Sequence, residues 1–295
     1  MSRLEGRVAV VTGASRGIGK GIATAFAAEG AAVAVVARTT SQWDPRMPGT
    51  IHDTVDEIVA AGGRAVAVAA DLANPDEVET VIARAKAELG PVDILVNNAA
   101  LTIPGRPPAD GSMVEPPAPP PPGQQRPTGG PRNSFLGFPL KGFRLHYEIG
   151  LFATYRLMQL ALPDMIELGR GAIVNISSLA GFIPGEGPYP RPGMPGPLAY
   201  GGNKAALHHL TQSVAIEMQA HGIAINVLSP SEPVITPGNL VAAAGETDWA
   251  SQEDFAEATL RLCVADPDEV NGQLLWSDDV LHPELGKRGW LRPMG

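Results

Sequence analysis

The chain has little cysteine, no long apolar run and no excess of basic residues. Its 295 residues include one cysteine, Cys263. An internal disulfide and a zinc cluster of thiolates are therefore excluded, and we expect no metal. No apolar run approaches the roughly 20 residues that a membrane-spanning helix needs. The 22 basic and 31 acidic residues leave a formal net charge of −9, which argues against broad contact with nucleic acid or an anionic membrane.

The residues that are present fit a soluble α/β protein. Hydrophobic residues make up 44% of the chain, enough for a sizeable core, and 18% of the residues are charged. The N-terminal stretch MSRLEGRVAVVTG leads almost directly into an apolar strand and lacks the features of a signal peptide. We therefore expect a cytoplasmic protein that acts on a small molecule, with no nucleic-acid or membrane partner.

Short apolar runs alternate with helical segments along the chain. The runs lack in-out alternation, which is typical of parallel strands covered on both faces. They lie at 7–11, 32–37, 65–70, 93–97, 172–177, 223–229 and 273–277. The helical segments lie at 17–29, 50–61, 75–89, 141–168, 199–220 and 251–264. The alternation predicts one domain over residues 1–295, with a doubly wound parallel sheet of seven strands in a three-layer, Rossmann-type α/β/α fold.

Two segments rich in proline and glycine interrupt this rhythm, at 104–131 and 184–197. Proline lacks a backbone donor and fixes φ, so neither segment can form a helix or a central strand. Both leave the strand ends at which ligands of open α/β sheets bind. We expect two insertions near the active site that form a wall or lid over the substrate. The alternative for the first segment is a disordered decoration, because its composition is poor in residues that form a core.

A glycine-rich turn follows the first strand and opens the first helix. It reads Thr12-Gly13-Ala14-Ser15-Arg16-Gly17-Ile18-Gly19. Glycines let the backbone approach a pyrophosphate closely, and a helix N-terminus offers free N–H groups and the positive end of a dipole. The position and the glycines together predict a phosphate-binding turn. The alternative is a tight connection without a ligand.

This turn resembles the TGxxxGIG motif of the short-chain dehydrogenase/reductase family. Further motifs of that family follow in the same order along nearly the whole chain. They are Asp71-Leu72, Asn97-Asn98-Ala99-Ala100, Ser177-Ser178 and Tyr200-Gly201-Gly202-Asn203-Lys204, the last of which matches YxxxK. Each stands at the carboxyl end of an expected strand or at the start of a helix, where an open α/β sheet builds its site.

The resemblance implies a nicotinamide dinucleotide and identifies the residues that bind it. They are Gly13, Ser15, Arg16, Gly17, Ile18, Gly19, Arg38, Thr39, Asp71, Leu72, Asn98, Ala99, Ala100, Tyr200, Lys204, Val234 and Thr236. An acidic residue at the end of the second strand binds the ribose 2′-hydroxyl and repels a 2′-phosphate. Here Arg38 stands in that region and Arg16 adds a second positive charge. Two arginines without a carboxylate favour NADP(H).

The same resemblance implies carbonyl chemistry at Tyr200. Tyr200 and Lys204 are one helical turn apart, so their side chains share a face. Positive charge from the lysine and from oxidised nicotinamide is expected to lower the pKa of the phenol. Tyr200 can then act as the general acid in reduction or the base in oxidation. Ser178, followed by Leu179-Ala180-Gly181, matches the serine that binds the substrate oxygen, and Ser177 matches it less well.

The sequence departs from the family pattern at three places. Gly150 stands where the family usually has an asparagine that helps hold a water beside the lysine, although glycine keeps a carbonyl and permits a local distortion of the helix. Ser231 replaces a glycine in the segment 229–236, which has an extra residue. Ser277-Asp278-Asp279 replaces a glycine pair in the last strand.

The motifs favour an NADP(H)-dependent oxidoreductase that interconverts a ketone or aldehyde and an alcohol. A small, apolar segment at 237–250 suggests a hydrophobic substrate, cyclic, terpenoid or steroid-like. One alternative, which Gly150 supports, is a nucleotide-binding sensor or interaction protein with weak or no turnover. Another is a structural protein without a cofactor. Analogy with related folds predicts a homo-dimer or homo-tetramer that associates through the long helices after the fourth and fifth strands.

Overall fold

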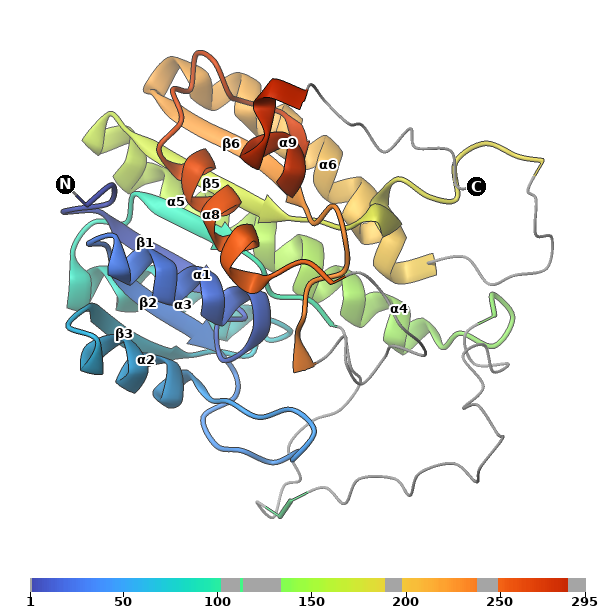
Figure 1. The fold of residues 1–295 in the computed structure, drawn as a ribbon. Helices are drawn as coiled ribbons and strands as arrows, with labels where there is room; N and C mark the ends of the chain where they lie inside the picture. The colour runs from blue at the N-terminus through green and yellow to red at the C-terminus, as the bar shows by residue number, and fades with distance from the viewer. Residues whose placement is uncertain (1, 102–111, 114–133, 189–197, 238–248, 286–295) are drawn as a thin grey trace.

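Seven parallel strands form one sheet in the order β3-β2-β1-β4-β5-β6-β7 (Figure 1). The computed structural model describes residues 2–101, 112–113, 134–188, 198–237 and 249–285. The strands are β1 Val8–Thr12, β2 Ala32–Ala37, β3 Arg64–Ala69, β4 Ile94–Asn97, β5 Gly171–Ile176, β6 Ile223–Ser229 and β7 Leu274–Trp276. The predicted seven-stranded parallel sheet is confirmed, and most strand boundaries agree to within one residue.

Helices cover both faces of this sheet and make three layers (Figure 1). One face packs against α1 Gly17–Ala28, α2 Ile51–Ala60 and α8 Gln252–Cys263. The other packs against α3 Pro75–Leu89, α5 Ala153–Leu168 and α6 Leu198–Met218. Successive residues of β1 alternate between these two cores, with Ala9 and Val11 in the first and Val8 and Val10 in the second. An apolar run without polar alternation is thus buried on both sides, as a covered parallel strand requires.

The helix predicted at 141–168 is interrupted. It consists of α4 Leu140–Tyr147, a π-helical turn η2 over Glu148–Phe152, and then α5. In the π turn the backbone N–H of Ala153 donates to the carbonyl of Glu148, five residues earlier. The predicted helix is thus present in three parts, and the π turn, whose hydrogen bonds span one residue more than those of an α-helix, includes Gly150, where a distortion was expected.

The end of the last strand also differs from the prediction. A short helix, α9 Ser277–Leu281, begins directly after β7, so Ser277 belongs to a helix rather than to a strand. The remaining short turns are η3 Leu179–Gly181, η4 Gln219–His221 and η5 Pro283–Leu285.

The chain reverses its direction of growth across the sheet next to β1. Val8 of β1 lies opposite Ala32 of β2 on one side, and Ala9 lies opposite Ile94 of β4 on the other. Loops leaving the carboxyl ends of β1 and β4 therefore diverge, which opens a crevice for a ligand. The predicted insertion at 104–131 lies outside the described residues except for Ser112 and Met113, and only Pro184 to Pro188 of the second are described.

Two expectations from the sequence concern regions away from this crevice. Cys263 is buried on α8, and burial raises the pKa of its thiol to about 12, so it behaves as a small apolar side chain. Among the helices of the described residues, none is long and apolar enough to cross a bilayer.

Candidate active site

A cavity of about 740 Å³ opens at the carboxyl ends of the strands. Nearly all the site residues expected from the sequence line it, from the glycine turn to the catalytic helix. They are Gly13, Ser15, Arg16, Gly17, Ile18, Arg38, Thr39, Asp71, Leu72, Asn98, Ala99, Ala100, Ser178, Tyr200, Lys204, Val234 and Thr236. The exception is Gly19, which lies buried beneath the turn. The fold thus brings residues from seven separate segments to one hollow.

The glycine turn is shaped by close backbone contacts. Gly13 has φ +67°, a backbone conformation that is unfavourable for any residue with a Cβ. A Cβ there would also lie 2.9 Å from Asn98 Nδ2. A Cβ on Gly19 would collide with the carbonyl oxygen of Gly13. Asn98 closes the turn by donating from Nδ2 to the Thr12 carbonyl at 2.9 Å. The backbone is consequently bare where a pyrophosphate would approach.

The N-terminus of α1 has no side-chain cap. Its N-cap residue, Arg16, makes no capping hydrogen bond, and the first turn carries no acidic residue. The N-termini of α2, α3 and α8 are capped by Thr50, Asn74 and Ser251. The free N–H groups of α1 and its dipole therefore point an uncompensated positive potential toward the cavity.

Two arginines add charge at the adenosine end. Arg16 Nη2 donates to the Gly49 carbonyl at 2.8 Å, and its Nε is buried without a hydrogen-bond partner. Burial and the charge of Arg38 lower the pKa of Arg16, while Asp44 acts in the opposite direction. Bringing two guanidinium groups together costs free energy, which an anion between them would offset. Trp43 and Met47, which the sequence did not single out, line the same end.

Ser178, Tyr200 and Lys204 form the catalytic end. Ser178 follows β5, and its Oγ accepts a hydrogen bond from the Ala180 N–H at 3.2 Å. Lys204 is 2% exposed, and its Nζ donates to the Ile176 carbonyl at 2.6 Å. The same Nζ lies 5.8 Å from the centroid of the Tyr200 ring. Burial lowers the pKa of Lys204 to about 8, so the amine is mostly charged at neutral pH.

The Tyr200 phenol departs from the sequence expectation. Burial raises its pKa, and a hydrogen bond with Ser178 offsets only part of that shift. The prediction of a lowered pKa invoked Lys204 and oxidised nicotinamide together, and in the protein alone desolvation of the phenolate dominates. The resting phenol is therefore protonated, which is the form that a general acid needs.

Two histidines near the catalytic residues were missed in the sequence. Ser177 Oγ and His208 Nε2 lie 2.7 Å apart, so the Ser177 hydroxyl is engaged by the histidine, whereas Ser178 is hydrogen-bonded with Tyr200. Burial, aided by the charge of Lys204, lowers the pKa of His208 to about 4, so its ring is neutral. The signal was available, because His208 follows Lys204 by one helical turn. His146 of α4 presents its ring edge to Tyr200 at 6.1 Å between centroids.

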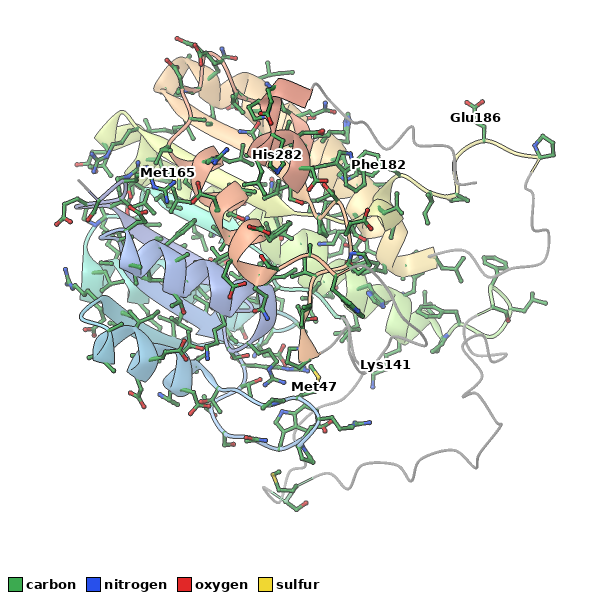
Figure 2. All side chains as sticks on the ribbon, in the orientation of Figure 1. Met47, Lys141, Met165, Phe182, Glu186 and His282 are labelled. Carbon is green, nitrogen blue, oxygen red and sulfur yellow. The ribbon has the colours of Figure 1, made fainter. Side chains whose placement is uncertain are left out.

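Phe182, labelled in Figure 2, covers the His208 ring at 4.5 Å between centroids. It also contacts the ring of Trp276 at 5.3 Å. The Ser177–His208 pair is thus sealed from solvent by aromatic side chains, which explains the depressed pKa of the histidine.

Gly150 is the middle residue of the π turn, and Asn203 of α6 occupies the space beside it. A Cβ on Gly150 would lie 2.5 Å from Asn203 Oδ1. The Asn203 side chain is 2% exposed; its Nδ2 donates to the Ala199 carbonyl at 3.0 Å, and its Oδ1 is buried without a partner. The expected distortion of the helix at Gly150 is thus present, and an asparagine amide faces this position from the neighbouring helix.

The other two departures from the family pattern also meet in space. Ser231 N–H donates to Ser277 Oγ at 3.1 Å, Ser277 Oγ donates to Ser231 Oγ at 3.2 Å, and Asp278 N–H donates to Ser231 Oγ at 3.0 Å. These bonds fix the segment that carries Val234 and Thr236. Val234 forms a parallel bridge with Ala250.

Thr236 lies over the glycine turn, and its Cγ2 would be 3.2 Å from a Cβ on Gly17. Asn98 instead contacts the turn at Gly13 and Gly19. An uncapped helix and a backbone cradle that a Cβ would fill fit the pyrophosphate of a dinucleotide, and the buried Arg16 Nε without a partner fits an anionic group beside it.

Comparison with known proteins agrees with a dinucleotide-binding site. The short chain dehydrogenase family model matches residues 7–113 and 128–238. The chain is 30% identical over 283 residues to the 7alpha-hydroxysteroid dehydrogenase of Escherichia coli K12, covering 92% of this chain and 93% of that protein.

Two solved structures illustrate the likeness and the range of coenzymes. A 7 alpha-hydroxysteroid dehydrogenase complexed with NADH and 7-oxo glycochenodeoxycholic acid matches with a TM-score of 0.70 and 28% identity, over 93% of each chain. An NAD(P)-dependent gluconate 5-dehydrogenase from Beutenbergia cavernae with bound NADP matches with a TM-score of 0.69 and 29% identity, over 94% of this chain and 98% of that one. Such relatives bind either coenzyme, so the choice depends on this chain's own residues.

Proposed function

The chain belongs to the short-chain dehydrogenase/reductase family, and on this premise we propose that it is an NADP(H)-dependent oxidoreductase interconverting a ketone or aldehyde and an alcohol. One observation carries the proposal: Ser178, Tyr200 and Lys204 line the same cavity as Arg16 and Arg38. A proton donor and a phosphate-binding end therefore share one hollow.

The coenzyme would lie along the cavity from the arginines to the lysine. Arg16 and Arg38 would hold the 2′-phosphate, and the N-terminus of α1 would hold the pyrophosphate. Asp71 and Leu72 would border the adenine, and Val234, Thr236 and Lys204 would hold the nicotinamide end. NADP(H), when bound, supplies or accepts the hydride.

The side chains of this protein would manage the substrate oxygen and its proton. Ser178 Oγ accepts from Ala180 and is hydrogen-bonded with Tyr200 in the protein alone, and its hydroxyl proton would turn to the substrate oxygen when substrate binds. In reduction Tyr200 Oη donates its proton to that oxygen, and in oxidation it takes the proton back. The charged Lys204 beside the ring stabilises the phenolate formed in between.

A hydrophobic substrate fits the catalytic end. Leu101, Ile149, Leu179 and Pro230 line the cavity together with the catalytic residues. Apolar walls with few polar groups select a ligand by shape and by burial of its surface. Together with the likeness to a hydroxysteroid dehydrogenase, these walls support a cyclic, terpenoid or steroid-like ketone or alcohol.

The rival function is a nucleotide-binding sensor with weak or no turnover. In the sequence, Gly150 was the feature that supported a sensor. In the structure Gly150 lies in a π turn and packs against Asn203, so it does not by itself argue for a loss of activity. A sensor also has no use for all three of Ser178, Tyr200 and Lys204. A panel of cyclic and open-chain ketones and alcohols, followed by NADPH absorbance, separates the two, and NADPH binding with no turnover of any member would favour the sensor.

We also propose a homo-dimer or homo-tetramer. Apolar side chains are exposed where η2, α5 and α6 meet solvent, with Phe152 at 53%, Tyr155 at 46% and Ile216 at 80%. Exposed apolar groups gathered on long helices are typical of subunit contacts. Sedimentation velocity tests this, and a monomer at micromolar concentration would contradict it.

A further inference from the structure

The loop between β2 and α2 holds a carboxylate in an ion pair. Asp44 Oδ1 accepts from Arg46 Nε at 2.9 Å and from the Arg46 backbone N–H at 3.0 Å, and Oδ2 accepts from Arg46 Nη2 at 2.6 Å. The Asp44 side chain is 2% exposed and that of Arg46 is 27% exposed. Arg46 therefore grips both carboxylate oxygens in a fork and separates them from solvent.

This ion pair lies at the adenosine end of the cavity. Trp43 and Met47, its neighbours in the chain, line that cavity with Arg16 and Arg38. The Met47 N–H donates to the Asp44 carbonyl at 3.0 Å, and Met47 stands on this loop in Figure 2. The charge of Asp44 acts on the guanidinium of Arg16. The carboxylate is thus within electrostatic range of the side chain expected to bind phosphate.

A carboxylate in this position has a defined effect on coenzyme choice. It repels a 2′-phosphate through its charge and can accept a hydrogen bond from a 2′-hydroxyl. The sequence placed no carboxylate at the end of the second strand, yet the fold brings Asp44 back to that end from six residues further along the chain. Unpaired, Asp44 would work against Arg16 and Arg38.

We propose that Arg46 neutralises Asp44 and that this pair is a specificity determinant favouring the 2′-phosphorylated coenzyme. The inference rests on the proposed preference for NADP(H) and adds two residues to it. Arg46 contributes by offsetting and shielding the charge of Asp44, so the cavity keeps more of the positive potential of Arg16 and Arg38 than it would beside an unpaired carboxylate.

The test compares the binding of NADPH and NADH by fluorescence titration at one ionic strength. Arg46→Gln removes the charge and keeps a polar, though shorter, side chain. We expect it to weaken NADPH binding about tenfold, which corresponds to about 1.4 kcal/mol, and to leave NADH binding within about twofold. Asp44→Asn in the Arg46→Gln background removes the exposed carboxylate, and we expect it to restore most of the preference. Arg46→Lys, which keeps the charge but not the fork, should lie between wild type and Arg46→Gln.

Arg156→Gln is the matched control. Arg156 makes a similar fork to Glu79, at 2.6 and 2.7 Å, between α5 and α3. Arg156→Gln changes the net charge of the protein by the same amount as Arg46→Gln, but at a position away from the cavity. It should therefore leave the affinities for NADPH and NADH unchanged.

Equal weakening of NADPH and NADH by Arg46→Gln would show that the pair only supports the loop, and would overturn the proposal. An Asp44→Asn/Arg46→Gln protein that discriminates no better than Arg46→Gln would overturn it too. Wild-type protein that binds both coenzymes equally would instead contradict the proposed preference for NADP(H). A wild-type preference that persists unchanged in Arg46→Gln contradicts the role of the pair alone.

Discussion

The two ends of the cavity are built in different ways. The adenosine end depends on short stretches of chain, with the turn Gly13 to Gly19 and the loop after β2 supplying backbone N–H groups and arginines. The catalytic end depends on Ser178, which follows β5, and on Tyr200 and Lys204 of α6, the helix whose Asn203 faces the π turn. A binding turn made from one short stretch depends mainly on its own residues. A site assembled from distant segments depends on contacts between them, so a change in one segment requires a matching change in another.

The departures from the family pattern follow this division. Gly150 faces Asn203 of α6, and two of the departures, Ser231 and Ser277, are hydrogen-bonded to each other. Asn203 fills the space beside Gly150, and hydrogen bonds join Ser231 to Ser277. Residues in contact are coupled, so changing one of them alone leaves a cavity or a collision.

Removing the Tyr200 hydroxyl should have the largest effect and should be confined to the catalytic end. We expect Tyr200→Phe to lower kcat for ketone reduction by roughly 10³-fold, because general acid catalysis contributes on that order. NADPH affinity should stay within about threefold, since the adenosine end is untouched. Steady-state kinetics and fluorescence titration measure the two quantities. Retention of more than a tenth of the activity would refute the role of Tyr200.

Reversing the charge of Arg38 at the adenosine end should change coenzyme binding and leave the catalytic end intact. Arg38→Asp is expected to weaken NADPH binding about 100-fold and to strengthen NADH binding, because a carboxylate repels the 2′-phosphate and binds the 2′-hydroxyl. The value of kcat with saturating NADH should remain measurable, because Ser178, Tyr200 and Lys204 are unchanged. An unaltered NADPH-to-NADH affinity ratio would be the contrary result.

The pairing of Gly150 and Asn203 can be broken and then repaired. Gly150→Asn places a side chain against Asn203 Oδ1, where a Cβ alone would be 2.5 Å away. We expect a loss of about 2 kcal/mol in the free energy of unfolding, as overpacked cores lose. Adding Asn203→Ser makes room, and the double variant should recover at least half of that loss in urea titrations.

Gly142 of α4 supplies the control for this experiment. A Cβ there meets its nearest neighbour, Pro139 Cγ, at 3.6 Å, which is ordinary contact. Gly142→Ala should therefore leave stability unchanged or raise it by up to about 1 kcal/mol through the unfolded state. If Gly150→Asn and its double variant with Asn203→Ser are equally destabilised, the two residues are not partners.

The charge of Lys204 gives the catalytic end a pH dependence. Burial holds its pKa at about 8, so the amine is charged below that pH and loses its charge as pH rises through it. We expect kcat/KM for reduction to be level near neutral pH and to fall about tenfold per pH unit above the pKa. In Lys204→Arg the falling limb should move upward or disappear, because a guanidinium keeps its proton. A limb at the same pH in both proteins would assign it to another group.

The sequence predicted the parts of the molecule that depend on local pattern. Apolar runs without alternation located the strands, and the glycines between β1 and α1 located the turn, because both are properties of contiguous residues. The π turn was not predictable in this way, since the side chain facing Gly150 comes from Asn203, on another helix. His208 and Asp44 were missed for the same reason: their partners and their distance from the cavity are set by packing.

The proposed reaction is tested most directly by labelling the hydride that NADPH transfers. NADPH carrying deuterium at the transferable position of the nicotinamide is incubated with the protein and a panel of cyclic and steroid-like ketones, and the products are weighed by mass spectrometry. We expect an alcohol with one deuterium on the former carbonyl carbon, formed by wild-type protein and almost absent with Tyr200→Phe. Protein that binds NADPH but transfers no deuterium to any ketone, or a Tyr200→Phe protein that transfers it as well as wild type, would contradict the account.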